Sequence, residues 1–123
     1  WTIRRAPLPR GVQGDICWPT RTITVDPRLP PAVQRCAIAH ETEHAHRGPL
    51  PADPVLAAKE EDLVERAAAR RLIKLHPLGE AMAESDDLRH VAHLLDVDPA
   101  LLRARLAHLH PAETAHLRRR LDG

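Results

Sequence analysis

The sequence predicts an α+β domain, in which a small N-terminal β-ribbon precedes two long helices and a helical tail. Prolines and glycines interrupt residues 1–30 so often that no long helix fits there. Within that segment, Thr22–Val25 alternates polar and apolar β-branched side chains, the pattern of a half-buried strand. From Pro31 onward, apolar residues recur at helical spacing in a sequence rich in Ala, Leu and Arg. These three observations define the fold class.

The ribbon is expected to be a hairpin, in which Gly14–Trp18 pairs with Thr22–Val25 across a turn at Pro19-Thr20. The first helix should begin at Pro31, because proline suits the first turn, and end near Arg47, where glycine and proline follow. Four of its residues recur at spacings of four, three and four and therefore share one face: Val33, Ala37, His40 and His44.

The second helix should run from Pro54 to about Leu75, with Asp53 as its N-cap and a break at Pro77. Three shorter helical patterns follow, and they begin at Asp86 or Asp87, at Asp98-Pro99 and at Pro111. A chain of 123 residues has the size of one domain with one core. We therefore expect a single domain, residues 1–123, divided into ribbon and loops (1–30), two long helices (31–76) and helical tail (86–123).

Composition excludes several classes of function. The formal charge of +1 gives no field that would favour nucleic acid or an anionic membrane. No apolar run approaches the roughly 18 residues that span a bilayer, and no signal peptide is visible. The two cysteines suit a reducing cytosol, so we expect a cytoplasmic protein. Because the chain opens at Trp1 rather than Met, we expect it to be a fragment of a longer one.

Residues 40–44, His-Glu-Thr-Glu-His, form an H-E-x-x-H motif on the first expected helix. His40 and His44 lie one turn apart on the same face, so both imidazoles can reach one tetrahedral Zn²⁺. Glu41 is rotated off that face, where its carboxylate reaches a metal-bound water instead of the metal. Zinc lowers the pKa of such a water to about 7, and Glu41 would accept its proton as general base. The motif predicts a zinc metallopeptidase.

Chance is a weak explanation for the motif, although the chain contains nine histidines. With this composition, about 0.04 accidental matches are expected in a chain of this length. The alternative interpretation is a solvated His/Glu face on a surface helix.

A catalytic zinc usually takes three protein ligands, so the third must come from elsewhere. Glu61 and Glu65 lie four residues apart on the apolar stripe of the second helix, where a buried charge needs a partner. We assign Glu61 as the ligand and Glu65 as the acceptor that orients a ligand histidine through its other N–H. Glu65 as the ligand is the competing assignment, and an ordinary exposed carboxylate is the alternative for Glu61. Glu60 points to a different side and should be solvated.

These residues resemble the ImmA/IrrE family of metallopeptidases, within the H-E-x-x-H (gluzincin-like) proteases. The resemblance rests on residues 23–26 (ITVD), 35–44 (RCAIAHETEH) and 61–73. In the last stretch Glu61 matches the family's ligand glutamate, Glu65 its Asn/Asp position and Ala68-Ala69 its small pair. Residues 91–97 and 102–106 resemble the pseudo helix-turn-helix end of the family.

The resemblance implies an intracellular zinc protease, often associated with phages or mobile elements, that cleaves a repressor or another regulator. It also implies a sheet edge beside the active-site helix. Glu65 departs from the family by its length, and Ala67 replaces an aromatic residue. The chain has no tyrosine to stabilise an oxyanion, which leaves four histidines as substitutes: His46, His76, His108 and His110.

The predicted reaction is therefore hydrolysis of a peptide bond in a protein or peptide substrate, which would lie extended along the edge of Thr22–Val25. One alternative keeps the zinc but makes the chain a binding or regulatory module, such as an inactive protease or antirepressor. A DNA-binding helix-turn-helix is a further alternative. The tail argues against it, because its acidic and basic residues balance and Asp98-Pro99-Ala100-Leu101 offers no side chain that reads base edges. Packing or substrate docking is the expected role of the tail.

Overall fold

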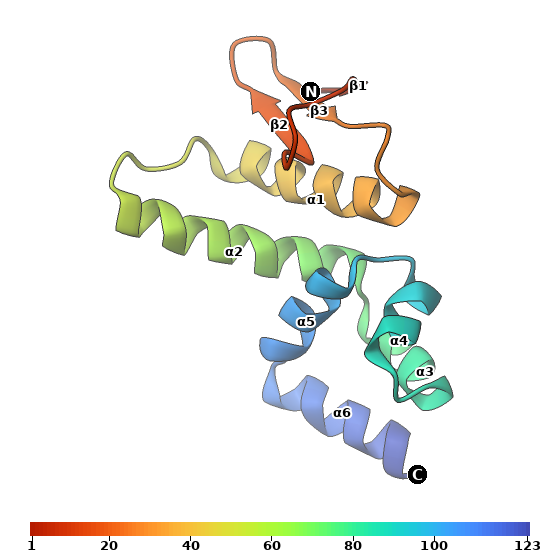
Figure 1. Cartoon of the computed structure of the whole chain (residues 1–123). Helices are drawn as coiled ribbons and strands as arrows, with labels where there is room; N and C mark the ends of the chain where they lie inside the picture. The colour runs from red at the N-terminus through yellow and green to blue at the C-terminus, as the bar shows by residue number, and fades with distance from the viewer.

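The computed structural model describes all residues, 1–123, and it has the α+β class that the sequence predicts (Figure 1). A three-stranded sheet is followed by six helices. The elements are β1 Thr2–Arg5, β2 Gly14–Cys17, β3 Thr22–Val25, α1 Pro31–Arg47, α2 Pro54–Leu72, α3 Leu75–Glu84, α4 Leu88–Leu95, α5 Pro99–Ala107 and α6 Pro111–Asp122. None of these helices combines the length and hydropathy that crossing a membrane requires.

The sheet has the strand order β1-β3-β2, with β1 parallel and β2 antiparallel to β3. The predicted hairpin of β2 and β3 is confirmed, and Arg21 in its turn adopts a positive φ of 51°. Strand β1 was not predicted. Its four residues are all exposed, so the segment lacks the apolar alternation that marks a half-buried strand.

The central position of β3 corrects one expectation. Because β1 and β2 occupy both sides of β3, no free edge remains at Thr22–Val25, and the prediction that a substrate adds to that strand is wrong. A two-stranded ribbon would have left that edge free, whereas β1 covers it in the three-stranded sheet. The strand whose edge remains free beside α1 is β2, and Gly14 of β2 lies directly against this helix.

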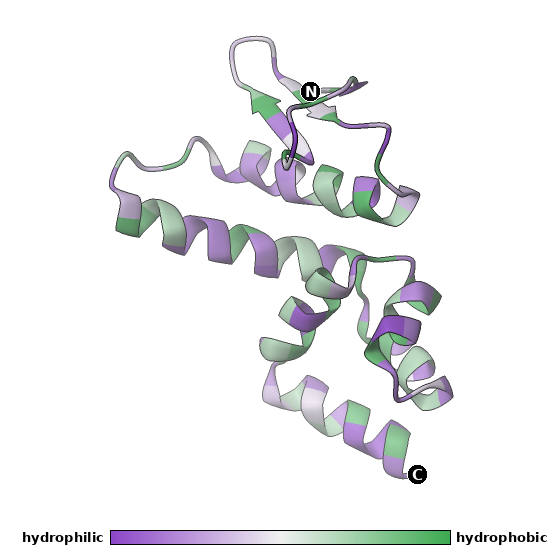
Figure 2. Cartoon of the chain, in the orientation of Figure 1, coloured by the Kyte–Doolittle hydropathy of each residue, from purple (hydrophilic) through white to green (hydrophobic).

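Helix α1 lies between the sheet and α2 (Figure 1). It spans the predicted residues, and its C-cap Gly48 takes a φ of 95°, which a glycine adopts without strain. The sheet turns Ile23 and Val25, which are 2% and 0% exposed, toward the interior. In Figure 2 hydrophobic and hydrophilic residues alternate along both α1 and α2, because successive turns present both faces.

Helix α2 begins as predicted, with Asp53 accepting hydrogen bonds from the N–H groups of Val55 and Leu56 at 2.8 and 3.1 Å. It ends at Leu72 rather than near Leu75, and a helix that was not predicted, α3, follows. Pro77 falls in the first turn of α3. A proline there sacrifices no intrahelical hydrogen bond, because the first N–H groups of a helix have no partner within it. Pro77 therefore belongs to the first turn of α3 and is not the residue at which α2 ends.

The tail helices begin where the sequence predicts, with Asp87 and Asp98 capping α4 and α5. They share one apolar core with the C-terminal half of α2. This core consists of Cys36, Ala39, Ala68, Ala69, Ile73, Leu78, Ala81, Val91, Ala92, Val97, Leu101, Leu102 and Leu117. The fully buried Ala68 and Ala69 leave room for close approach of α5, so the tail is an integral layer of the fold.

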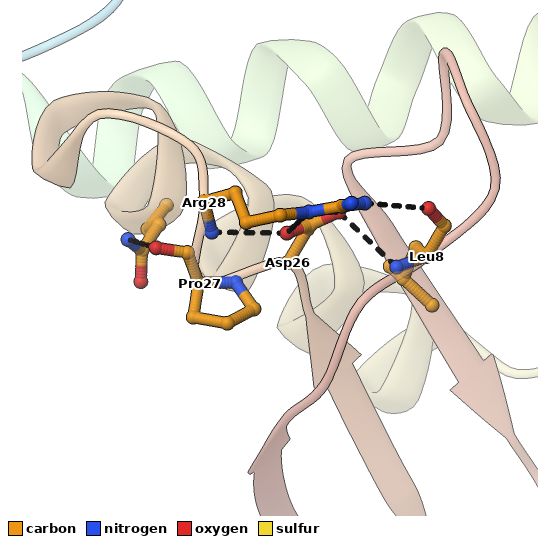
Figure 3. Close-up of polar contacts among 5 residues, drawn as sticks. Leu8, Asp26, Pro27 and Arg28 are labelled. Atoms are coloured by element: carbon orange, nitrogen blue, oxygen red, sulfur yellow. Dashed lines mark hydrogen bonds and ion pairs between the residues drawn. The ribbon is translucent and has the colours of Figure 1, made fainter.

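Asp26 fastens the long loop between β1 and β2 to the end of β3 (Figure 3). Its Oδ2 accepts a hydrogen bond from the Leu8 N–H at 3.1 Å and pairs with Arg28 at 2.6 Å. Arg28 in turn donates to the Leu8 carbonyl at 3.0 Å. These bonds hold the pKa of the Asp26 carboxyl well below its usual range, chiefly through Arg28. The anchored loop continues to Gly11, Val12 and Gln13, which reach the candidate site described next.

Candidate metal centre

Helices α1 and α2 bring His40, His44 and Glu61 together. The two histidines lie one turn apart on α1, and both turn their Nε2 atoms toward the Glu61 carboxylate. His40 Nε2 lies 3.1 Å from Glu61 Oε2, and His44 Nε2 lies 3.1 Å from Glu61 Oε1. The three donor atoms lie within 4.8 Å of one another, the spacing at which they can hold one metal ion.

Glu65 lies one turn further along α2 and contacts only one of the histidines. Its Oε2 is 3.2 Å from Nδ1 of His40. This hydrogen bond is the main cause that raises the pKa of His40, with smaller contributions from Glu41 and Glu61 and with burial opposing them. The structure thus separates the two carboxylates that the sequence left in competition. Glu61 faces both imidazoles, whereas Glu65 reaches the far nitrogen of one.

The hydrogen positions of this cluster decide what it can hold. If Nδ1 of a neutral His40 donates to Glu65, its Nε2 presents a lone pair to the Glu61 oxygen 3.1 Å away. Two lone pairs at that distance repel each other unless a proton or a cation lies between them. Two imidazole nitrogens and one carboxylate oxygen form a donor set of catalytic zinc sites, and it leaves one tetrahedral position open. The residues present therefore fit a zinc ion.

Glu41 lies beside this cluster, directly under strand β2. A Cβ at Gly14 would come within 3.1 Å of Glu41 Cγ and 3.5 Å of Ala37 Cβ, so a larger residue would require the Glu41 side chain to shift. Burial is the main cause that raises the pKa of Glu41, while His40 and His44 oppose the rise. Glu41 is thus a half-buried carboxylate at the place where α1 packs against β2.

Two cavities meet at Glu41 and Gly14, which line both of them. The larger, which we call lobe A, has a volume of about 500 Å³. It is lined by Gly11, Val12, Gln13, Gly14, Cys36, Ala37, His40, Glu41, Glu65, Asp98, Ala100 and Leu101. The smaller, lobe B, has about 300 Å³ and is lined by Gly14, Asp15, Ile16, Trp18, Glu41, His44, Leu50 and Glu61. Together the lobes form a cleft beside β2, and the His/Glu cluster contributes His40 and Glu65 to one lobe and His44 and Glu61 to the other.

The free edge of β2 offers main-chain groups to this cleft. The Asp26 N–H donates to the Gln13 carbonyl at 3.3 Å, which fixes the phase of the antiparallel ladder between β2 and β3. Because bonded and non-bonded pairs alternate along such a ladder, the N–H and C=O groups of Gly14 and Ile16 point away from β3. They are available to an added strand.

The remaining acidic and histidine candidates lie outside the cleft. Glu60, expected to be solvated, pairs with Arg47. The four histidines suggested for oxyanion stabilisation are also elsewhere, and none lines either lobe: His46, His76, His108 and His110. No local pattern predicts that Trp18, Leu50 and the first turn of α5 line the cleft, because only tertiary packing brings them to the motif.

No protein-family model matches this chain, and comparisons with curated proteins and with solved structures find no match either.

Proposed function

We propose that this chain is a zinc-dependent endopeptidase of the H-E-x-x-H type, with the ImmA/IrrE-like character that its motifs indicate. One observation carries the proposal. His40 and His44 of α1 and Glu61 of α2 offer three metal-binding atoms within 4.8 Å of one another, beside a half-buried glutamate in an open cleft. The donor set has room for one further ligand, which is typical of catalytic rather than structural zinc.

Each residue of the site has a defined task in this proposal. His40, His44 and Glu61 hold the ion, and Glu65 fixes the ring of His40 through Nδ1. When bound, zinc polarises a carbonyl and lowers the pKa of a water molecule to about 7. Glu41 accepts a proton at its carboxylate and can return it to the leaving amine. The burial that raises the pKa of Glu41 brings it closer to the working range of a general base.

The cleft suits an extended peptide. Gly14 and Ile16 direct free N–H and C=O groups toward it, so a peptide can pair with β2 as an added strand. Glu41 and Gly14 are shared by both lobes, which puts the base between the side chains that enter lobe A and those that enter lobe B. In keeping with the family resemblance, the substrate would be a regulator such as a transcriptional repressor.

Two measurements test the proposal on the purified chain. Zinc content should be about one ion per chain in the wild type and in Glu41→Gln, but close to none in His44→Ala. Cleavage of random peptide pools, followed by the appearance of new amino termini, should fall by about 10²- to 10⁴-fold in Glu41→Gln. Glu60→Gln is the matched control, because Glu60 neighbours Glu61 in sequence but pairs with Arg47 outside the cleft. Full cleavage by Glu41→Gln would refute the assignment of the base.

A zinc-containing binding or regulatory module is the second candidate, and one observation favours it. Apart from the ligand histidines, no histidine, lysine, arginine or tyrosine lines either lobe, so no side chain of these types faces a developing oxyanion. Such a module would bind zinc and peptides in wild type and Glu41→Gln alike, without Glu41-dependent cleavage. The same pair of variants therefore separates the two candidates.

A further inference from the structure

The tail contributes to the lining of lobe A through Asp98, Ala100 and Leu101 at the start of α5. Val12 of the β1–β2 loop and Ala37 of α1 line the same cavity. Apolar and polar groups share this lining, and Asp98 is the carboxylate that the tail adds to it. The tail, whose role the sequence left open between packing and docking, therefore contributes to the cleft as well as to the core.

Apart from the two ligand histidines, the charged side chains that line the cleft are all acidic. Five carboxylates line the two lobes, and no lysine or arginine lines either: Asp15, Glu41, Glu61, Glu65 and Asp98. In the proposed function Glu41, Glu61 and Glu65 serve the metal centre. Asp98 is different, because its Oδ1 accepts the Ala100 N–H at 2.8 Å while its Oδ2 makes no hydrogen bond. Arg35 of α1 binds a different residue, Asp96. Its Nη1 donates to the Asp96 carbonyl oxygen at 2.6 Å and to the Asp96 Oδ2 atom at 3.1 Å.

We propose that lobe A binds a lysine or arginine side chain of the substrate. Its aliphatic stem would lie against Val12, Ala37 and Leu101, and its cationic end would reach the Oδ2 atom of Asp98. A long side chain with an apolar stem and a charged tip matches a cavity that is lined by both apolar side chains and carboxylates and by no lysine or arginine. Asp98 is then a specificity-determining residue. The inference rests on the proposed function for the cleavage that follows binding, but the preference for a basic side chain concerns binding alone.

Two matched variants isolate the charge of Asp98. Asp98→Asn removes the charge and preserves the helix cap, because asparagine caps as well as aspartate does. Asp87→Asn makes the same change at the start of α4. There Asp87 caps the helix by accepting the Arg89 N–H, and it lines neither lobe. Both variants are made on the Glu41→Gln background so that bound peptides survive. The probes are three fluorescein-labelled pools of random nonapeptides, with lysine, glutamine or glutamate fixed at the central position, and binding is read by fluorescence polarisation.

The lysine pool should bind about three- to tenfold more tightly than the glutamine pool, and the glutamate pool most weakly. Asp98→Asn should abolish the advantage of lysine over glutamine, and Asp87→Asn should retain it. Equal binding of the lysine and glutamine pools, absence of binding by all three, or an unchanged preference in Asp98→Asn overturns the inference.

Cleavage of the same pools by the wild type separates this inference from the proposed function. Glu41-dependent cleavage without a preference for the lysine pool leaves the peptidase standing and removes the basic subsite. An Asp98-dependent preference in binding, without cleavage of any pool, refutes the peptidase and leaves a basic-peptide-binding cleft.

Discussion

The two halves of the α1–α2 pair have opposite chemistry. At one end α1 contributes Cys36 and Ala39 to the apolar core, where the fully buried Ala68 and Ala69 of α2, with Ile73 just after it, meet the tail. At the other end the facing side chains are ionisable: His40, His44, Glu61 and Glu65, with Arg47 and Glu60 beyond them. There α2 also leaves Val55, Leu56 and Leu63 exposed.

The comparison shows how one pair of helices divides stability from chemistry. Burial of apolar surface stabilises the end that meets the tail. The end with the cluster gains less from burial, since the side chains of Glu61 and Glu65 are 42% and 39% exposed. A cation would supply there the attraction that the apolar core supplies at the other end.

Removing a core leucine should have the largest effect. Leu102 of α5 is fully buried against α2, so Leu102→Ala should lower the free energy of unfolding by about 2–5 kcal/mol through lost burial and a residual cavity. Leu94→Ala is the control, because Leu94 of α4 is 38% exposed and should cost well under half as much. Urea unfolding followed by circular dichroism measures both. Equal losses would mean that α5 is not part of the core.

Acid should weaken the apolar end through one ion pair. Glu113 bonds to the buried Arg105 at 2.5 and 3.1 Å, and this contact chiefly lowers its pKa from 4.5 to about 2. A carboxyl whose pKa is depressed on folding stabilises the fold above pH 4.5 and loses that stabilisation as the pH falls toward 2. The loss should be about 2–4 kcal/mol, because a tenfold change in proton affinity corresponds to about 1.4 kcal/mol. Unfolding of Glu113→Gln at pH 6 and pH 3 should show a smaller difference than the wild type, whereas the exposed, unpaired Glu84→Gln should match the wild type.

Zinc should stabilise the polar end. A ligand that binds only the folded chain raises the free energy of unfolding by about 2.7 kcal/mol when its free concentration is about 100 times the dissociation constant. Urea unfolding with zinc and with EDTA should therefore differ for the wild type and for Glu41→Gln, which keeps all three proposed ligands. His44→Ala should unfold alike in both. A zinc response in His44→Ala would place the ion at another site.

The features that could be predicted from the sequence are those that depend on residues close together along the chain. Pro31 and Asp53 fix helix starts by local chemistry, and the four-residue spacing of His40 and His44 fixes their shared face. Strand β1 escaped prediction because its partner lies about twenty residues further along, and its exposed side chains carry no pattern. Lobe A escaped for a similar reason, since Asp98 reaches the motif only when α5 packs on α2. Contacts between distant segments are therefore the part of the site that required coordinates.

The smallest expected effect concerns Glu65, the carboxylate that the sequence could not distinguish from the metal ligand. Glu65→Gln keeps the size of the side chain but replaces a charged acceptor on His40 Nδ1 with a neutral one, so zinc should bind about 10-fold more weakly. Loss of a true ligand, as in Glu61→Gln, should weaken binding much further. Competition with a chromophoric chelator measures both, and Glu60→Gln provides the unperturbed reference. If Glu65→Gln proves the more damaging of the two, the roles of these carboxylates are reversed, because an acceptor that only orients a ring cannot matter more than the atom that binds the ion.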